Sequence, residues 1–234
     1  MTFVTGFGAN DTHAKILNDG RINQHHNSGK PYQTVTLADI HRKASEPPQV
    51  DKANGQWIIP SAYNDHDARS HAVQREHGSF GALAVDIDQG NHTAATVVEA
   101  LDTALGQDIT RMWWSTPSST EGNKKWRVLI PLAAPLPGDW YSGAQAALFD
   151  ALEACDIYPD RTMERTGQVL YLPNRGEFYE WGWIGESYLT HEHPLFQRAH
   201  QYVQAMDEIR AHASNTSRSE GPRSFLGAFR RKHS

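Results

Sequence analysis

The chain is poor in cysteine, in long apolar runs and in positive charge, and each shortage excludes a class of protein. A single cysteine, Cys155, excludes an intramolecular disulfide, and its place on the apolar face of an expected helix predicts a buried, unreactive thiol. No apolar run approaches the roughly 18 residues of a membrane span. Residues 1–6 lack the basic and apolar regions of a secretory leader. We therefore expect a cytoplasmic protein without a membrane partner.

The charge balance and the missing motifs narrow the choice further. A net charge of −5 over 234 residues argues against a protein that coats nucleic acid non-specifically. It leaves room for an enzyme that binds nucleic acid through local patches and metal ions. The phosphate loop G-x-x-x-x-G-K-[ST] does not occur, which argues against a motor ATPase within this sequence. His25-His26 lacks the flanking apolar run of a relaxase motif, and His191-Glu192-His193 has no cysteine partner for zinc, so we interpret both as surface histidines.

Regular patterning begins at Phe80. Residues 1–79 scatter glycine, asparagine, histidine and proline, and predict only a strand at Gln56–Pro60 and a helix near Asp65–His77. The next segments alternate strand and helix patterns in a clear order. They are a strand at Phe80–Ile87, a helix capped by Thr93 and ending at Gly106, a hairpin of Ile109–Thr116 with Lys125–Leu132, a helix at Asp139–Cys155 and a strand at Gln168–Leu172.

This β-α-β-β-α-β order predicts an α+β fold of the ferredoxin-like or RNA-recognition type, with the first strand in the centre of the sheet. An added strand at Glu177–Ile184 and a terminal helix at Pro194–Ala213 follow. We expect four parts: an N-terminal accessory α/β subdomain at 1–79, the sheet domain at 80–190, the terminal helix at 191–213, and a polar basic tail at 214–234.

Asp86 and Asp88 form the most informative local pattern. They follow a run of small and apolar residues and are separated by Ile87, so a strand would point both carboxylates to one face. Paired carboxylates suit a shared Mg²⁺ or Mn²⁺ ion. The alternative is a strand that ends in two solvated acids before a turn.

Four sequence pieces, in order, resemble the primase-polymerase domain of phage and plasmid replication proteins, in the archaeo-eukaryotic primase superfamily. They are Asp86-Ile87-Asp88, the run Trp114–Thr120 continuing into Lys125–Leu132, Asp160-Arg161-Thr162, and Gln168–Pro173. The resemblance covers Phe80 to Trp183, with a looser echo at Arg75–Gly78. It implies a palm-like catalytic sheet and template-directed nucleotidyl transfer.

The resemblance also implies the catalytic residues. Asp86 and Asp88 match the paired acids of the first motif, and Asp160 matches the acid of the third, with Asp156 as the alternative. Three carboxylates suit a two-metal site, whose ions lie about 3.5–4 Å apart and act on the attacking 3′-hydroxyl and the departing pyrophosphate. The implied cofactor is Mg²⁺ or Mn²⁺.

The implied nucleotide site departs from the superfamily at one position. The second motif usually ends in a histidine, and Ser119 stands there. Ser118 and Ser119 could hydrogen-bond phosphate oxygens, and Arg127 could offer a bidentate fork to a triphosphate. The alternative is a polar hairpin loop beside an exposed arginine.

The remaining motif residues are assigned to nucleotide or template. Gln168 could contact either one, and Tyr171 could stack on a base, although a buried tyrosine that closes the sheet is the alternative. Lys124 and Lys125 are either a solvated rim or template contacts.

The implied function is a DNA primase and polymerase that joins dNTPs or NTPs on single-stranded DNA, in phage or plasmid replication inside a bacterial host cell. The alternatives are a metal-dependent nuclease and a non-catalytic origin or single-strand binding module. The segment Arg218–Arg231 resembles a linker to a following region, so we expect a helicase domain downstream in cis. We expect the isolated domain to be monomeric.

Overall fold

A computed structural model describes residues 1–8 and 32–219, with side chains to residue 212. Its strands form two four-stranded sheets, and all strand pairs within them are antiparallel. The N-terminal sheet has the order β2-β1-β3-β7, with β1 at Thr2–Phe7, β2 at Gln33–Thr36, β3 at Gln56–Ile59 and β7 at Leu170–Tyr171. Across the described ranges, no helix is both long and apolar enough to cross a bilayer.

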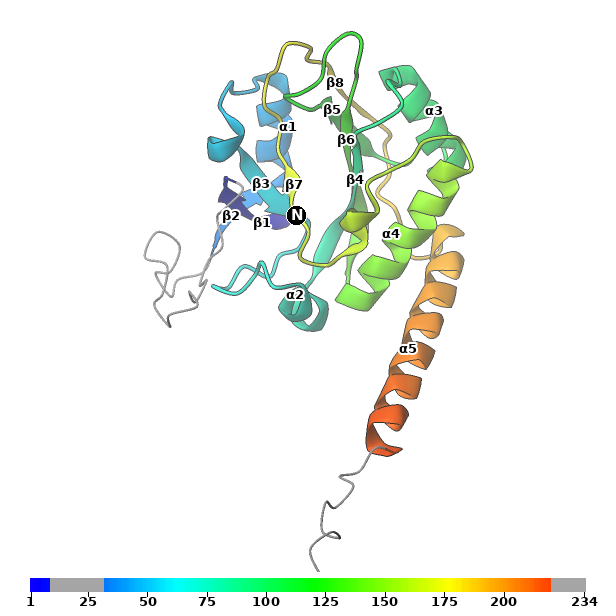
Figure 1. The fold of residues 1–234 in the computed structure, drawn as a ribbon. Helices are drawn as coiled ribbons and strands as arrows, with labels where there is room; N and C mark the ends of the chain where they lie inside the picture. Colours follow the sequence, from blue (N-terminus) through cyan, green and yellow to red (C-terminus); the bar gives the residue numbers. More distant parts are fainter. Residues whose placement is uncertain (9–31, 220–234) are drawn as a thin grey trace, which may run out of the picture.

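The second sheet has the order β4-β6-β5-β8. Its strands are β4 at Phe80–Ile87, β5 at Arg111–Ser115, β6 at Trp126–Leu136 and β8 at Trp181–Ile184. The α+β class and the β5–β6 hairpin agree with the sequence predictions. Figure 1 shows this sheet between the N-terminal sheet and the helices α3 (Ala94–Leu105) and α4 (Gly138–Glu153).

Two predictions about this sheet are wrong. The strand expected to be its fourth member, β7, pairs instead with β3 of the N-terminal sheet, through Trp57 opposite Tyr171. Consequently β4 is an edge strand, not a central one, and β8 occupies the other edge beside β5. Because β7 lies within residues 80–190, the two expected parts of the chain share a sheet.

Backbone groups on the free edge of β4 form hydrogen bonds with partners other than a strand. The buried Gln145 side chain accepts a hydrogen bond from the Ala84 amide (3.1 Å) and donates one to the Ala84 carbonyl (2.6 Å). Two residues further on, the backbone amide of Asp160 donates to the Asp86 carbonyl (2.8 Å). Buried backbone groups must find partners, and here a helix side chain and a loop supply them.

The helices begin and end largely where the sequence indicates. Thr93 caps α3 by accepting from the Thr96 amide, and Gly106 ends it with φ +87°, a conformation that favours glycine. The other helices are α1 at Leu37–Ser45, η1 at Lys52–Asn54, α2 at His71–His77, η2 at Arg161–Glu164 and α5 at Leu195–Ser219. The predicted helix at Asp65–His77 is therefore too long at its start, and the terminal helix extends beyond Ala213. The tail from residue 220 and His25-His26 lie outside the described residues.

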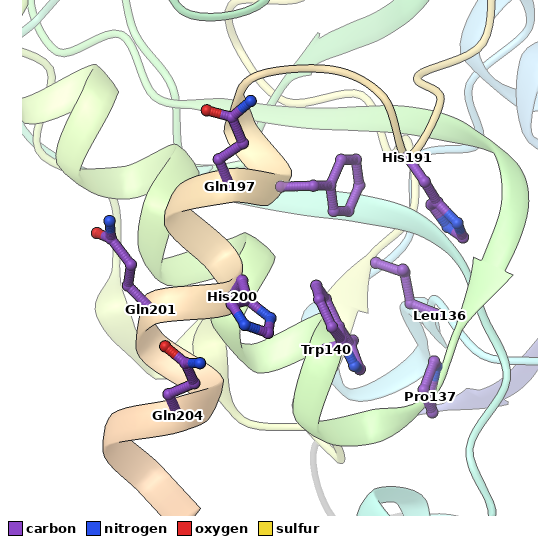
Figure 2. A pocket seen from close by; sticks show the side chains of 9 residues that line it. Leu136, Pro137, Trp140, His191, Gln197, His200, Gln201 and Gln204 are labelled. Carbon is purple, nitrogen blue, oxygen red and sulfur yellow. The ribbon is translucent and has the colours of Figure 1, made fainter.

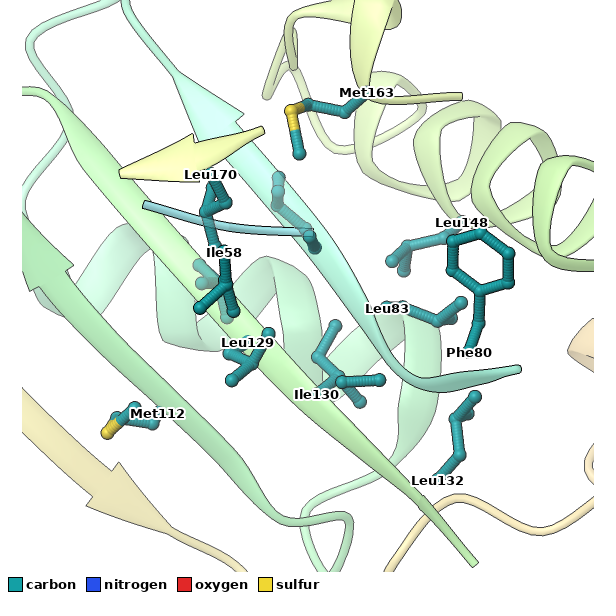
Figure 3. Close-up of a cluster of buried hydrophobic side chains, with 14 of the residues drawn as sticks. Ile58, Phe80, Leu83, Met112, Leu129, Ile130, Leu132, Leu148, Met163 and Leu170 are labelled. Carbon is teal, nitrogen blue, oxygen red and sulfur yellow. The ribbon is translucent and has the colours of Figure 1, made fainter. Parts of the chain in front are cut away.

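One contiguous apolar core joins the two sheets and α4 (Figure 3). Ile58 and Leu170 reach it from the N-terminal sheet, and Leu129 reaches it from β6. On the α4 side, the rings of Phe80 and Tyr141 stack with centroids 4.0 Å apart. This shared core fixes β7 next to the second sheet. Cys155 is only partly buried, so the prediction of a buried thiol is correct only in that the residue packs against the core.

Candidate metal and nucleotide site

Asp86 lies near the end of β4 with its carboxylate almost out of solvent contact. Its side chain is 15% exposed, and Arg127 stands opposite it in the β4–β6 register. Nε of Arg127 donates to Oδ2 of Asp86 at 3.2 Å, whereas Oδ1 is buried and has no hydrogen-bond partner among the described residues. Burial raises the pKa of Asp86, the nearby charges of Asp88 and Asp160 add to the rise, and Arg127 opposes it.

Asp88 and Asp160 lie close to Asp86, but their carboxylates have separate partners. Asp88 is half-exposed just beyond β4, with Oδ1 3.4 Å from Nζ of Lys125. Asp160 caps η2, and its carboxylate accepts from the amide and hydroxyl of Thr162 at 2.9 and 2.7 Å. The structure thus brings the three predicted acids to one end of the β4 edge, and their metal-binding role stays a prediction.

A second group of side chains, on another loop, is compact enough to hold a metal ion. Asp65, His66 and Asp67 have ligand atoms within 4.8 Å of one another, and no other group of three does so in the described ranges. These residues could hold a metal ion. Their atoms already interact locally, since Asp65 contacts the His66 ring at 3.0 Å and Asp67 accepts from the Tyr63 hydroxyl at 2.9 Å. This group was not among the site residues predicted from the sequence, although the run Asp-His-Asp is a local signal for it.

The two serines of the second motif occupy different environments. Ser118 is exposed in the loop after β5. Ser119 is fully buried, and its hydroxyl donates to the Lys125 carbonyl (2.9 Å) and accepts from the Lys125 amide (3.0 Å). The Ser119 hydroxyl therefore fastens the loop to the start of β6, and only Ser118 faces solvent.

Arg127 and Tyr171 connect the two sheets at the level of the acids. Besides Asp86, the Arg127 guanidinium contacts the Tyr171 carbonyl at 3.4 Å and lies 5.6 Å from the centroid of its ring. Tyr171 is half-buried, and burial raises the pKa of its hydroxyl. Gln168 is partly exposed two residues before β7.

The two lysines of the hairpin contact different parts of the structure. Nζ of Lys124 contacts Glu121 (3.0 Å) and lies 5.1 Å from the ring centroid of Phe178. Lys125 contacts Asp88 directly. Lys125 therefore lies next to the acids, whereas Lys124 contacts residues of the hairpin loop and Phe178.

Two cations near Tyr171 were missed from the sequence. Nζ of Lys52 lies 5.7 Å from its ring centroid, and the charge of Arg69 acts on its hydroxyl. Arg69 also lies over the ring of the buried Trp57, at 5.1 Å. Lys52 and Arg69 precede Tyr171 by 119 and 102 residues, so only the fold brings them to its ring.

A hollow of about 730 Å³ lies elsewhere, between β6, α4 and α5 (Figure 2). Trp140, His191 and His200 line it together with apolar and glutamine side chains, and no Asp, Glu, Lys or Arg does. None of the predicted site residues lies there, so it is separate from the acids.

No protein-family model matches the chain, and no curated protein matches it. Among solved structures, the chain matches the AEP domain of the primase-polymerase (PrimPol) of cyanophage S-2L, with 16% identity, 87% of each chain covered and a TM-score of 0.43. The cyanophage domain is of the class that the four sequence motifs resemble.

Proposed function

We propose that the chain is a metal-dependent nucleotidyltransferase, a primase-polymerase that joins nucleotides on a single-stranded DNA template. The observation that carries the proposal is the environment of Asp86. A carboxylate with one orphaned, buried oxygen lies beside two further acids at the end of a strand edge. Burial and the neighbouring negative charges disfavour the ionised form of Asp86, and a bound cation would stabilise that form.

The residues present fit a divalent ion. Asp86, Asp88 and Asp160 offer only carboxylate oxygens, the donors that hard Mg²⁺ and Mn²⁺ prefer. When bound, such ions lower the pKa of an attacking hydroxyl and stabilise charge on a leaving phosphate. The three acids are the residues that would hold them.

The neighbouring residues bind and orient. Arg127 fixes one oxygen of Asp86 and leaves the other, buried oxygen unpaired, and the Asp160 amide fixes the backbone of the same residue. Lys125 and Arg127 place two cations beside the acids, where they could contact a triphosphate. Ser118 is the solvent-facing hydroxyl of the loop, and Ser119 holds that loop in place. Tyr171 offers a ring for a base, with Gln168 nearby in sequence.

The finer assignments rest on the sequence resemblance. They are a role in phage or plasmid replication, a helicase domain downstream in cis, the use of dNTPs or NTPs, and the monomeric state of the domain. A metal-dependent nuclease would use the same acids with water as the nucleophile. A single-strand binding module would use the same sheet without chemistry.

A primer-extension assay separates these functions. The purified chain is incubated with a labelled primer on a single-stranded template, Mn²⁺ and all four nucleotides, and a second reaction uses an unprimed template. We expect the labelled strand to lengthen. Shortening of the strand would establish the nuclease, and retention without a change in length would establish the binding module.

A further inference from the structure

A line of cations runs from the acids toward α2. Arg127 and Lys52 lie against the Tyr171 ring, at 5.6 and 5.7 Å from its centroid. Arg69 lies over the ring of Trp57, which pairs with Tyr171, and the Arg69 carbonyl and Nδ1 of His71 both lie beside Gly167. The charges of Arg69, Arg75 and Arg165 all lower the pKa of His71.

The far end of this line opens into a cavity of about 700 Å³. His71, Arg75 and Arg165 line it together with Ser142, Thr166 and Tyr202, and Arg161 and Glu164 complete the charged part of the wall. The hydroxyls of Ser142, Thr166 and Tyr202 already donate to Glu164, His71 and Asp150. The cavity therefore offers guanidinium and imidazole groups as donors for phosphate.

The cations of this cavity are not equally available. Arg161 is held by Asp150, Glu153 and Glu164, with contacts of 2.5 to 2.8 Å. Arg75 is half-exposed and lies 3.8 Å from Asp139, a loose contact. Arg165 is exposed, and within the described part of the chain it forms no ion pair. Arg75 and Arg165 are therefore the cations that remain for a ligand.

The wall around His71 is fixed. Nδ1 of His71 accepts from the Gly167 amide at 3.0 Å, and the Thr166 hydroxyl donates to the His71 carbonyl at 2.6 Å. A Cβ at Gly167 would lie 2.9 Å from both the Arg69 carbonyl and Nδ1 of His71, so only glycine fits there. Because Nδ1 accepts from the Gly167 amide, the ring proton lies on Nε2. Burial and the three arginines lower the pKa of His71.

We propose that Arg75 and Arg165 bind successive phosphates of a single nucleic-acid strand, which passes from Tyr171 past Arg69 into the His71 cavity. The proposal deepens the proposed function, because it supplies the path by which a strand reaches the acids. It also explains how an acidic protein could bind a polyanion. A protein with net charge −5 needs a local row of cations to hold a polyanion, and this row is the one that begins at the acids.

The test measures binding of a labelled single strand at several salt concentrations, without metal or nucleotide, so that catalysis is not involved. For the double variant Arg75→Gln, Arg165→Gln, the slope of log affinity against log salt should fall by about 1.4, or about 0.7 for each lost contact. Arg42→Gln is the matched control, since Arg42 is an exposed arginine on α1 outside this line. Its slope should equal that of the unmodified protein. Equal slopes for the double variant and the control would overturn the proposal.

A second measurement uses the unmodified protein and does not depend on the folding of a variant. Phenylglyoxal modifies accessible arginines, and mass spectrometry identifies them with and without a single strand. Arg75 and Arg165 should be protected by the strand, and Arg42 should not. Protection by free nucleotide or pyrophosphate at equal phosphate concentration would assign the cavity to a small anion and overturn the strand path. Failure of primer extension would leave both readouts unchanged and would reject only the proposed reaction.

Discussion

Burial and the nearby charges of Asp88 and Asp160 disfavour the ionised carboxylate of Asp86. We expect Asp86→Asn and Asp88→Asn each to reduce primer extension by at least about 100-fold, because several kcal/mol of transition-state stabilisation depend on ligands of this kind. Asp86→Asn should not destabilise the fold, since it removes a buried carboxylate with an orphaned oxygen. Steady-state extension and thermal unfolding measure the two effects.

The matched control for these variants is Asp156→Asn. Asp156 is exposed near Asp160 and has φ +59°, a conformation that asparagine tolerates. Its extension rate should stay near that of the unmodified protein. If Asp156→Asn lost as much activity as Asp86→Asn, the third acid would be Asp156.

The buried hydroxyl of Ser119 gives a second prediction at the residue scale. Ser119→Ala leaves the Lys125 amide without its partner and leaves the Lys125 carbonyl with only the Thr116 amide, so we expect a loss of about 1–3 kcal/mol in the free energy of unfolding. Ser118→Ala, at the exposed neighbour, should leave stability unchanged and raise the KM for nucleotide. Denaturant unfolding and nucleotide titrations of the extension rate distinguish these effects. A Ser119→Ala protein of unchanged stability would contradict the fastening role.

At the scale of single elements, Gln145 replaces a strand at the edge of β4. Gln145→Leu would leave both backbone groups of Ala84 buried without partners, which should destabilise the protein by about 2–4 kcal/mol. Gln201→Leu on α5 is the control, because Gln201 is exposed. Denaturant midpoints should separate the two variants clearly. Equal midpoints would mean that the β4 edge finds other partners.

The contact between α4 and α5 should depend on pH. Arg210 holds the Asp139 carboxylate with two hydrogen bonds, of 2.7 and 2.8 Å, and these lower the pKa of Asp139. Stability from this pair is present above the ordinary aspartate pKa of 3.8 and is lost as pH falls through the lowered value. Because both side chains are partly exposed, Arg210→Gln should lose only about 0.5 kcal/mol at pH 7. In unfolding experiments, this difference should shrink as pH falls below 3.8 and disappear below the lowered pKa of Asp139.

The same elements show what the sequence could predict. The bounds of β4 and α3 followed from an apolar run, a threonine cap and a terminal glycine, which are all local signals. The partner of β7 did not, because a two-residue strand carries no information about which sheet it joins. The Gln145 contact was equally invisible, since a glutamine within a helix usually faces solvent.

Helix α1 was missed although a local signal existed. The Thr36 hydroxyl accepts from the Asp39 amide and the Asp39 carboxylate accepts from the Thr36 amide, which is a capping box. In the candidate site, the spacing of Asp86 and Asp88 was sufficient to find the acids. Lys52 and Arg69 could not be found in this way, because their approach to Tyr171 depends on how the two sheets pack.

On the scale of the whole molecule, two acidic groups compete as the metal site. Asp86, Asp88 and Asp160 lie at the junction of the two sheets, whereas Asp65, His66 and Asp67 lie on one exposed loop. An ion that binds only the folded chain stabilises it by about 2.7 kcal/mol at a concentration 100 times its Kd. For a chain of this length, that corresponds to a rise in Tm of roughly 5–10 °C.

We therefore expect Mn²⁺ to raise the Tm of the unmodified protein and of the double variant Asp65→Asn, Asp67→Asn by the same amount. Asp86→Asn should have an equal or higher Tm without metal, because the substitution removes the buried negative charge. For the same reason, added Mn²⁺ should raise its Tm only slightly. Thermal unfolding at several Mn²⁺ concentrations measures all three proteins. A rise that survives in Asp86→Asn and disappears in the Asp65, Asp67 variant would place the ion on the exposed loop. The junction of the sheets would then be a site for cationic side chains and nucleic acid alone.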